Sequence, residues 1–176
     1  MLFRSYIYLV QIVMLNNDGR VKGINGNAAM SSMASGTNVN TGHTSYTPSI
    51  VYFNTRLKRN MVAQGQPCEI IGGKFTTFGL CDMEPYTRAG KLYQGSRSNL
   101  KNNLFFNILF SNDGVKTYSV DVTQQCQSQA HGGVITVFID CAKLEPPEGP
   151  GDEGGTGSLF VPTVEDYDEV YWEVEL

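Results

Sequence analysis

Short apolar runs with a two-residue period, separated by Gly- and Asn-rich turns, dominate the chain. Such runs are typical of half-buried β-strands, whose side chains alternate between two faces. Strands are predicted at residues 5–15, 20–24, 49–54, 103–110, 117–122 and 133–139. No long segment shows the 3.6-residue period of a helix. The pattern predicts an all-β fold, an antiparallel β-sandwich of seven to eight short strands.

Turn signals suggest which runs form hairpins. Asn112-Asp113-Gly114 precedes a run in which Tyr118, Val120 and Val122 alternate, and this is the clearest hairpin in the chain. Asn17-Asp18-Gly19 predicts a hairpin between 5–15 and 20–24, and Gly72-Gly73 predicts one between 68–71 and 74–80. Residues 25–47 are compatible with a short strand or one helical turn. Residues 82–101 are polar and predict a long loop.

The composition divides the chain into three parts. Residues 1–144 are expected to form the sandwich, and residues 145–166, rich in Pro, Gly and acids, a linker. Residues 167–176 predict a terminal strand with Val170, Trp172, Val174 and Leu176 on one face. This strand could complete its own sheet or one in a partner, and the sequence does not separate the two.

Charge follows the same division. Residues 1–144 carry all thirteen Lys and Arg side chains against seven acids, whereas residues 145–176 hold ten acids and no Lys or Arg. The longest basic cluster, residues 56–59 near Tyr52 and Phe53, is too short to indicate a nucleic-acid surface. We therefore expect no nucleic-acid partner and solvated charges on the body.

Four cysteines, at positions 68, 81, 126 and 141, stand far apart in the sequence. Zinc ribbons and redox sites use close pairs, so a metal role is disfavoured. Two disulfides in an oxidising compartment and four free, buried thiols both remain open.

The N-terminal apolar run, residues 6–15, resembles the core of a signal peptide. It is too short to cross a bilayer, which requires about 20 apolar residues. Asn16 to Gly19 form a poor cleavage site and a good turn. The run therefore predicts a core strand, with no transmembrane span and no export signal in this chain.

Candidate chemistry is sparse. His43 and His131 lie in separate polar loops, and no nucleophile elbow, phosphate-binding loop or dinucleotide motif occurs. The acidic clusters at 152–153 and 165–169 lack the ligand spacing of a calcium loop. We expect a non-catalytic protein with no cofactor, no metal and no catalytic residue. A hydrolase using either histidine with a loop acid is the least favoured alternative.

Several loose motifs occur in a recognisable order. They are Gly-Ile-Asn-Gly at 23–26, Met-Ser-Ser-Met-Ala-Ser-Gly at 30–36, Tyr-Ser-Val-Asp-Val-Thr at 118–123, Gly-Gly-Val-Ile-Thr-Val at 132–137 and Phe-Val-Pro-Thr-Val-Glu-Asp-Tyr-Asp-Glu-Val at 160–170. With this order, most of the chain resembles the C-terminal half of an uncharacterised family of fimbrillin-like surface lipoproteins of Bacteroidales.

The resemblance implies a transthyretin-like β-sandwich and a structural or adhesion subunit at the cell surface, outer-membrane-associated or extracellular. It also implies other fimbrial subunits or surface proteins as partners, reached through the C-terminal strand. The chain has no lipid-accepting Cys near its start, and Ser32 stands where the family often has Gly; we therefore expect a truncated C-terminal half. The alternative is a glycan- or protein-binding module using Tyr86 and Tyr93.

Overall fold

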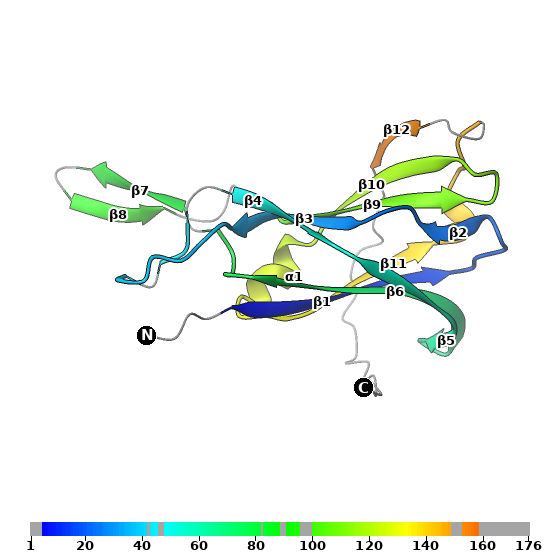
Figure 1. Cartoon of the computed structure of the whole chain (residues 1–176), viewed down its shortest axis with the longest axis horizontal. Helices are drawn as coiled ribbons and strands as arrows, with labels where there is room; N and C mark the ends of the chain where they lie inside the picture. Colours follow the sequence, from blue (N-terminus) through cyan, green and yellow to red (C-terminus); the bar gives the residue numbers. More distant parts are fainter. Residues whose placement is uncertain are drawn as a thin grey trace.

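The computed structural model describes residues 5–41, 43–45, 48–81, 83–88, 91–95, 100–148 and 153–158. It is an all-β sandwich of two facing sheets, which confirms the fold class expected from the sequence (Figure 1). The four strands of sheet A are, in order, β11 (Gly133–Asp140), β1 (Tyr6–Leu15), β6 (Gln66–Thr77) and β5 (Thr55–Ala63). The six strands of sheet B are β12 (Glu153–Ser158), β10 (Val115–Asp121), β9 (Asn103–Phe110), β3 (Ala28–Ala34) and β4 (Pro48–Phe53), with β2 (Val21–Ile24) also paired to β9.

The core lies between the two sheets and follows directly from alternation. On β1, Tyr8, Val10, Ile12 and Met14 are each at most 1% exposed. They face the buried residues of β9, which alternate perfectly with half-buried ones. Each large side chain buried in this way contributes about 1.5–3 kcal/mol of hydrophobic stabilisation. A two-residue period in the sequence is therefore sufficient to define the inner face of each central strand.

The directions of two strand pairs and the number of strands differ from those expected of a purely antiparallel sandwich. β1 pairs with β11 in parallel, from Tyr8 opposite Gly133 to Leu15 opposite Asp140. β10 and β12 are also parallel. The described residues contain twelve strands rather than seven or eight. β1 and β11 are joined by most of the chain rather than by a tight turn, so no hairpin forces them to run in opposite directions.

Two expected hairpins are absent from the described part of the chain. The turn at residues 16–19 carries the chain from sheet A to sheet B, because β2 pairs with β9 and not with β1. Gly72 and Gly73 lie inside the single continuous strand β6. Neither glycine has the positive φ of a primed turn. The second prediction failed because glycine in a strand can also mark the close approach of a neighbour.

Other segments contain more structure than expected. Within residues 25–47, β3 forms a strand whose register shifts between Met30 and Met33, around Ser32 at φ 57°. The loop expected over residues 82–101 contains the hairpin β7 (Met83–Arg88) and β8 (Lys91–Gly95). This hairpin extends from one end of the sandwich (Figure 1). Within the expected linker, residues 153–158 form β12.

Helical structure is limited to α1 (Thr123–Ser128) and one 3₁₀ turn, η2 (Cys141–Lys143), among the residues described. The hairpin of β9 and β10 around Asn112-Asp113-Gly114 is confirmed. Neither helical segment is of a length that could cross a bilayer. The terminal strand expected over residues 167–176, including Trp172, lies outside the described residues.

Candidate binding surface

A groove of about 850 Å³ lies between β4 and β6. It begins where the chain passes from β4 in sheet B to β5 in sheet A, at Asn54. β5 pairs with β6 only as far as Thr55 opposite Gly73. Beyond that point, residues 74–77 of β6 pair with β1 alone. The described strands therefore leave a side of the sandwich open between the edges of β4 and β6.

Gly73 determines how closely the two sheets approach at this point. A Cβ atom at Gly73 would lie 2.7 Å from Cδ2 of Phe53 and 2.8 Å from the carbonyl oxygen of Asn54. The Phe53 ring therefore occupies the space that any other residue at position 73 would fill. Gly72, one position earlier, has no atom closer than 4.0 Å to such a Cβ. The two adjacent glycines thus have different roles, and only Gly73 shapes the groove.

Two buried aromatic rings, those of Phe53 and Phe75, line the groove, and Phe75 packs on Tyr8 in the core. The ring centroid of Phe53 lies 5.2 Å from that of Phe75, which lies 5.4 Å from that of Tyr8. All three rings are buried. The walls carry exposed apolar side chains instead: Tyr52 is 68% exposed, Ile7 57% and Leu9 41%. Exposed apolar side chains gathered around a groove are typical of an interaction surface.

The electrostatics of the groove are one-sided. Arg56, Lys58 and Lys74 line it, and no acidic residue does. No ion pair joins any of these three side chains to a described acid. Arg59, the last residue of the basic cluster 56–59, lies outside the groove, and its Nη1 is 4.0 Å from Oε1 of Glu69. The groove therefore presents a positive, partly apolar surface, which favours an extended ligand that carries acidic and apolar groups.

The other residues singled out in the sequence do not line the groove. His43 and His131 are both exposed, and His131 packs its ring 5.1 Å from that of Tyr6. No described acid is hydrogen-bonded to His131, and the described residues contain no cluster suited to hold a metal ion. Tyr86 lies opposite Tyr93 in the β7–β8 register.

The four cysteines are buried and form no disulfide, so of the two open interpretations the structure has the one with thiols. Burial raises the pKa of Cys126 and of Cys141 to about 12. Burial, followed by the nearby Glu69 carboxylate, also raises the pKa of Cys68. Thiols of this kind are protonated at neutral pH and unreactive.

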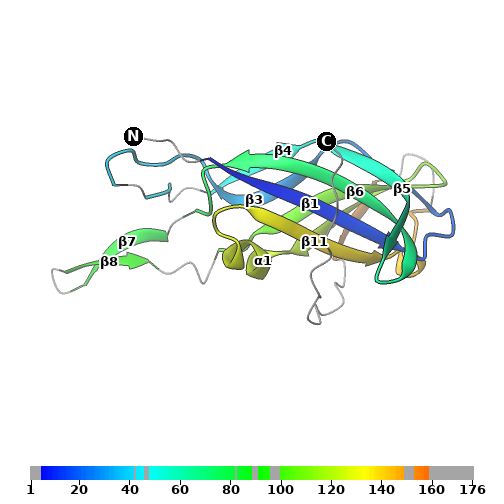
Figure 2. The same ribbon diagram turned by 90° about the horizontal axis from the view of Figure 1, so that it is seen from below.

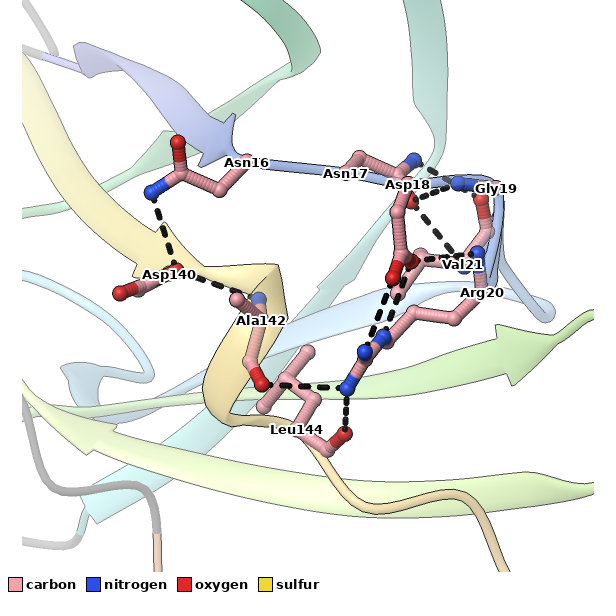
Figure 3. Close-up of polar contacts among 9 residues, drawn as sticks. All are labelled: Asn16, Asn17, Asp18, Gly19, Arg20, Val21, Asp140, Ala142 and Leu144. Carbon is pink, nitrogen blue, oxygen red and sulfur yellow. Dashed lines mark hydrogen bonds and ion pairs between the residues drawn. The ribbon is translucent and has the colours of Figure 1, made fainter.

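Polar contacts join the β1–β2 loop to the segment that follows β11 (Figure 3). Arg20 donates from Nε and Nη2 to the two carboxylate oxygens of Asp18, each at 2.9 Å. Its Nη1 donates to the carbonyl oxygens of Ala142 and Leu144, both at 3.1 Å. The hydrogen bond from Arg20 lowers the pKa of Asp18 to about 2. These contacts hold the sheet-crossing loop against η2, which gives Arg20 a structural role.

Sequence reasoning did not find the groove. Residues of four strands, β1, β4, β5 and β6, form it, and no local sequence motif predicts such a surface. The signals available were Gly73 inside an apolar run and the exposed Tyr52 beside basic residues. The first was interpreted as a turn and the second as a solvated face.

Comparison with known proteins adds little to this geometry. No protein-family model matches the sequence, and no curated protein matches it significantly. A solved structure with a similar course of the chain is that of a candidate adhesin from Bacteroides ovatus, at 11% identity. The similarity covers 90% of this chain and 50% of that one, with a TM-score of 0.45. This chain therefore spans about half the length of its structural neighbour, and membership of the fimbrillin-like family stays a prediction.

Proposed function

We propose that this chain is a non-catalytic structural subunit of the bacterial cell surface that joins a second copy of itself by strand addition. The acceptor is the groove between β4 and β6, and the donor is the C-terminal segment, residues 168–176, of the second copy. The observation that carries the proposal is the open edge of β6 at residues 74–77 beside exposed apolar side chains. The cell-surface location rests on the family resemblance of the sequence.

The donor matches the acceptor in shape and charge. From residue 169 on, one face of an extended strand would carry Val170, Trp172, Val174 and Leu176, and the other would carry three glutamates and Tyr171. The groove offers Ile7, Leu9 and Tyr52 for the first face and lysine and arginine for the second. Backbone hydrogen bonds to a sheet edge supply affinity in strand addition, and side-chain pockets supply specificity.

Trp172 provides a direct test because it is the only tryptophan in the chain. In dilute full-length protein, its fluorescence should be that of a solvated indole. As the concentration rises, the emission should shift to shorter wavelength, in step with dimer formation in sedimentation velocity. Removal of residues 159–176, which retains β12, should abolish the association.

The groove is tested by reversing its charge. Lys58→Glu/Lys74→Glu should weaken association, and high salt should weaken it in the wild type, because screened surface charges attract less. Lys101→Glu/Lys143→Glu, which reverses two exposed lysines outside the groove, is the matched control. Equal association in the groove variant and the control would refute the proposal. A fluorescence shift that does not depend on concentration would also refute it, since the tail would then dock on its own body.

The alternative, a glycan-binding module, is favoured by the cross-strand position of Tyr86 and Tyr93 on a hairpin that extends from the sandwich. Paired tyrosines are common in sugar sites because aromatic rings pack against apolar sugar faces. Glycan binding that is lost in Tyr86→Ala/Tyr93→Ala, with the dimer unaffected, would support this alternative.

A further inference from the structure

β11 is an edge strand of sheet A, because within the described residues only β1 pairs with it. An edge strand exposes unpaired backbone N–H and C=O groups, which can pair with another chain. At Val134 and Thr136 these groups point away from β1, toward α1. Figure 2 shows α1 lying beside β11 at this edge of the sheet.

Two glutamine side chains of this helical segment occupy the free hydrogen-bonding positions of the strand. Gln125 donates from Nε2 to the carbonyl oxygen of Thr136 at 2.8 Å and accepts from the Thr136 N–H at 2.9 Å. Gln129 makes the same pair of bonds with Val134, both at 2.8 Å. A primary amide has one acceptor and a donor pair, so each glutamine imitates the peptide group of a neighbouring strand.

Two glycines make room for this arrangement. A Cβ at Gly133 would lie 2.0 Å from Oε1 of Gln129. At Gly132, φ is +94° and a Cβ would lie 2.6 Å from the carbonyl oxygen of Ile7. Any other residue at position 133 would displace the Gln129 amide from the strand. The Gly132-Gly133 pair therefore serves the contact between α1 and β11 as well as the turn that precedes the strand.

α1 is short and is not stabilised by its own sequence. It has six residues, its N-cap residue Val122 makes no side-chain cap bond, and the N–H of its first residue, Thr123, donates to the Asp121 carboxylate. An isolated helix of this length does not form in water. Buried Cys126 and the two glutamines attach it to the sandwich. A hydrogen bond of 2.5 Å from the Tyr8 hydroxyl to the Gln129 carbonyl oxygen adds a further attachment.

The surface next to this edge is apolar. Val134 is 40% exposed and Leu9 41%, and the two are partners in the β1–β11 register. If the glutamines did not occupy the edge, a second copy could pair its own β11 with this one about a two-fold axis. That contact would add backbone hydrogen bonds to the burial of both apolar pairs.

We propose that Gln125 and Gln129 form an edge guard, whose function is to keep β11 from pairing with β11 of a second copy. The guard does not depend on the proposed strand addition, because it concerns the opposite edge of sheet A. It makes α1 a device against uncontrolled self-association.

The test is Gln125→Ala/Gln129→Ala in the full chain, with Gln124→Ala, an exposed residue of the same helical segment, as the control. Amide hydrogen exchange measured by NMR should be about tenfold faster or more at Val134 and Thr136 in dilute protein, because each amide loses its partner. Sedimentation velocity should show a new dimer at higher concentration. Adding Val134→Lys, which places like charges opposite each other in that dimer, should restore the monomer–dimer behaviour of the wild type.

Either of two results overturns the proposal. The amides of Val134 and Thr136 could remain protected, or they could exchange freely while self-association equals that of the control. If the double variant does not fold, the single variant Gln129→Ala decides, because it removes both hydrogen bonds to Val134 and retains those between Gln125 and Thr136. The same two results at Val134 then apply. If wild-type association does not depend on the groove but the new dimer of Gln125→Ala/Gln129→Ala still forms, the proposed function fails and the guard stands. If the new dimer does not form but wild-type association depends on the groove, the guard fails and the proposed function stands.

Discussion

Substituting each of two adjacent glycines on β6 should have opposite effects on stability. Gly73→Ala places a methyl group 2.7 Å from the Phe53 ring and 2.8 Å from the Asn54 carbonyl oxygen. Phe53 ends β4 and Asn54 links it to β5, so these neighbours can move only if the chain or the ring shifts. Overpacking of this kind costs about 1–3 kcal/mol. For a protein of this length, each kcal/mol lowers the melting temperature by about 2–4 °C.

Gly72→Ala is the matched control. No atom lies closer than 4.0 Å to the added methyl group, and the backbone there is not in the left-handed region. The substitution should be neutral or should stabilise the protein by about 0.4–1 kcal/mol, since alanine restricts the unfolded chain more than glycine. If the two glycines formed a hairpin turn, both substitutions would destabilise the protein.

Thermal and urea unfolding of the two variants, followed by circular dichroism, measure the difference. Phe53→Leu should lower the cost of Gly73→Ala, because the smaller side chain vacates the position that the methyl group needs, and a double-mutant cycle isolates this coupling. Equal melting temperatures for Gly72→Ala and Gly73→Ala, or additive effects of Phe53→Leu, would refute the assigned role of Gly73.

Two further predictions concern ionisable groups. Arg20→Ala should lower the melting temperature at pH 7. The lowered pKa of Asp18 contributes stability that is complete above pH 3.8 and lost as the pH falls toward 2, so Asp18→Asn should make stability depend less on pH in this range. An unchanged pH dependence of stability below pH 3.8 in Asp18→Asn would contradict the assignment. The raised pKa of Cys126 predicts that its thiol does not react with a thiol reagent at pH 8 in the folded protein, and rapid labelling of the native protein would exclude a buried thiol. It also predicts that stability declines as the pH rises above 9.0, because the thiol then loses its proton in the unfolded chain and keeps it in the folded one. Cys126→Ala should reduce this decline.

Several elements were predictable because their signal is local. The alternation of Tyr118, Val120 and Val122 identifies the inner face of β10 and its continuation, and all three are at most 4% exposed. Asn112-Asp113-Gly114 determines the hairpin between β9 and β10, since the Asn112 side chain accepts from the Gly114 N–H. In such segments, the turn and the burial pattern agree, so the sequence alone is sufficient.

The same kind of signal was misleading where a residue acts through a distant neighbour. A Gly-Gly pair is typical of a turn, but Gly73 has the conformation of a strand residue. Its small size matters because the Phe53 ring lies against it. Asn17 and Gly19 do form a turn, yet it leads to the other sheet because β2 finds its partner in β9. The contact of Gly73 with Phe53 and the pairing of β2 with β9 both depend on residues far along the chain, which the local sequence does not specify.

By itself, the sequence determined that this protein is a β-sandwich, where its central strands lie, and that its acids gather at the C-terminal end. Only the tertiary structure decided that β11 lies parallel to β1, that β4 and β6 leave a positive groove between them, and that two glutamines cover the edge of β11. The physical reason is the distance along the chain between the residues whose contacts decide each feature. Alternation and turns depend on neighbours in the chain, whereas pairing, grooves and covered edges depend on contacts between segments distant in the chain, such as Tyr8 and Gln129, which are 121 positions apart.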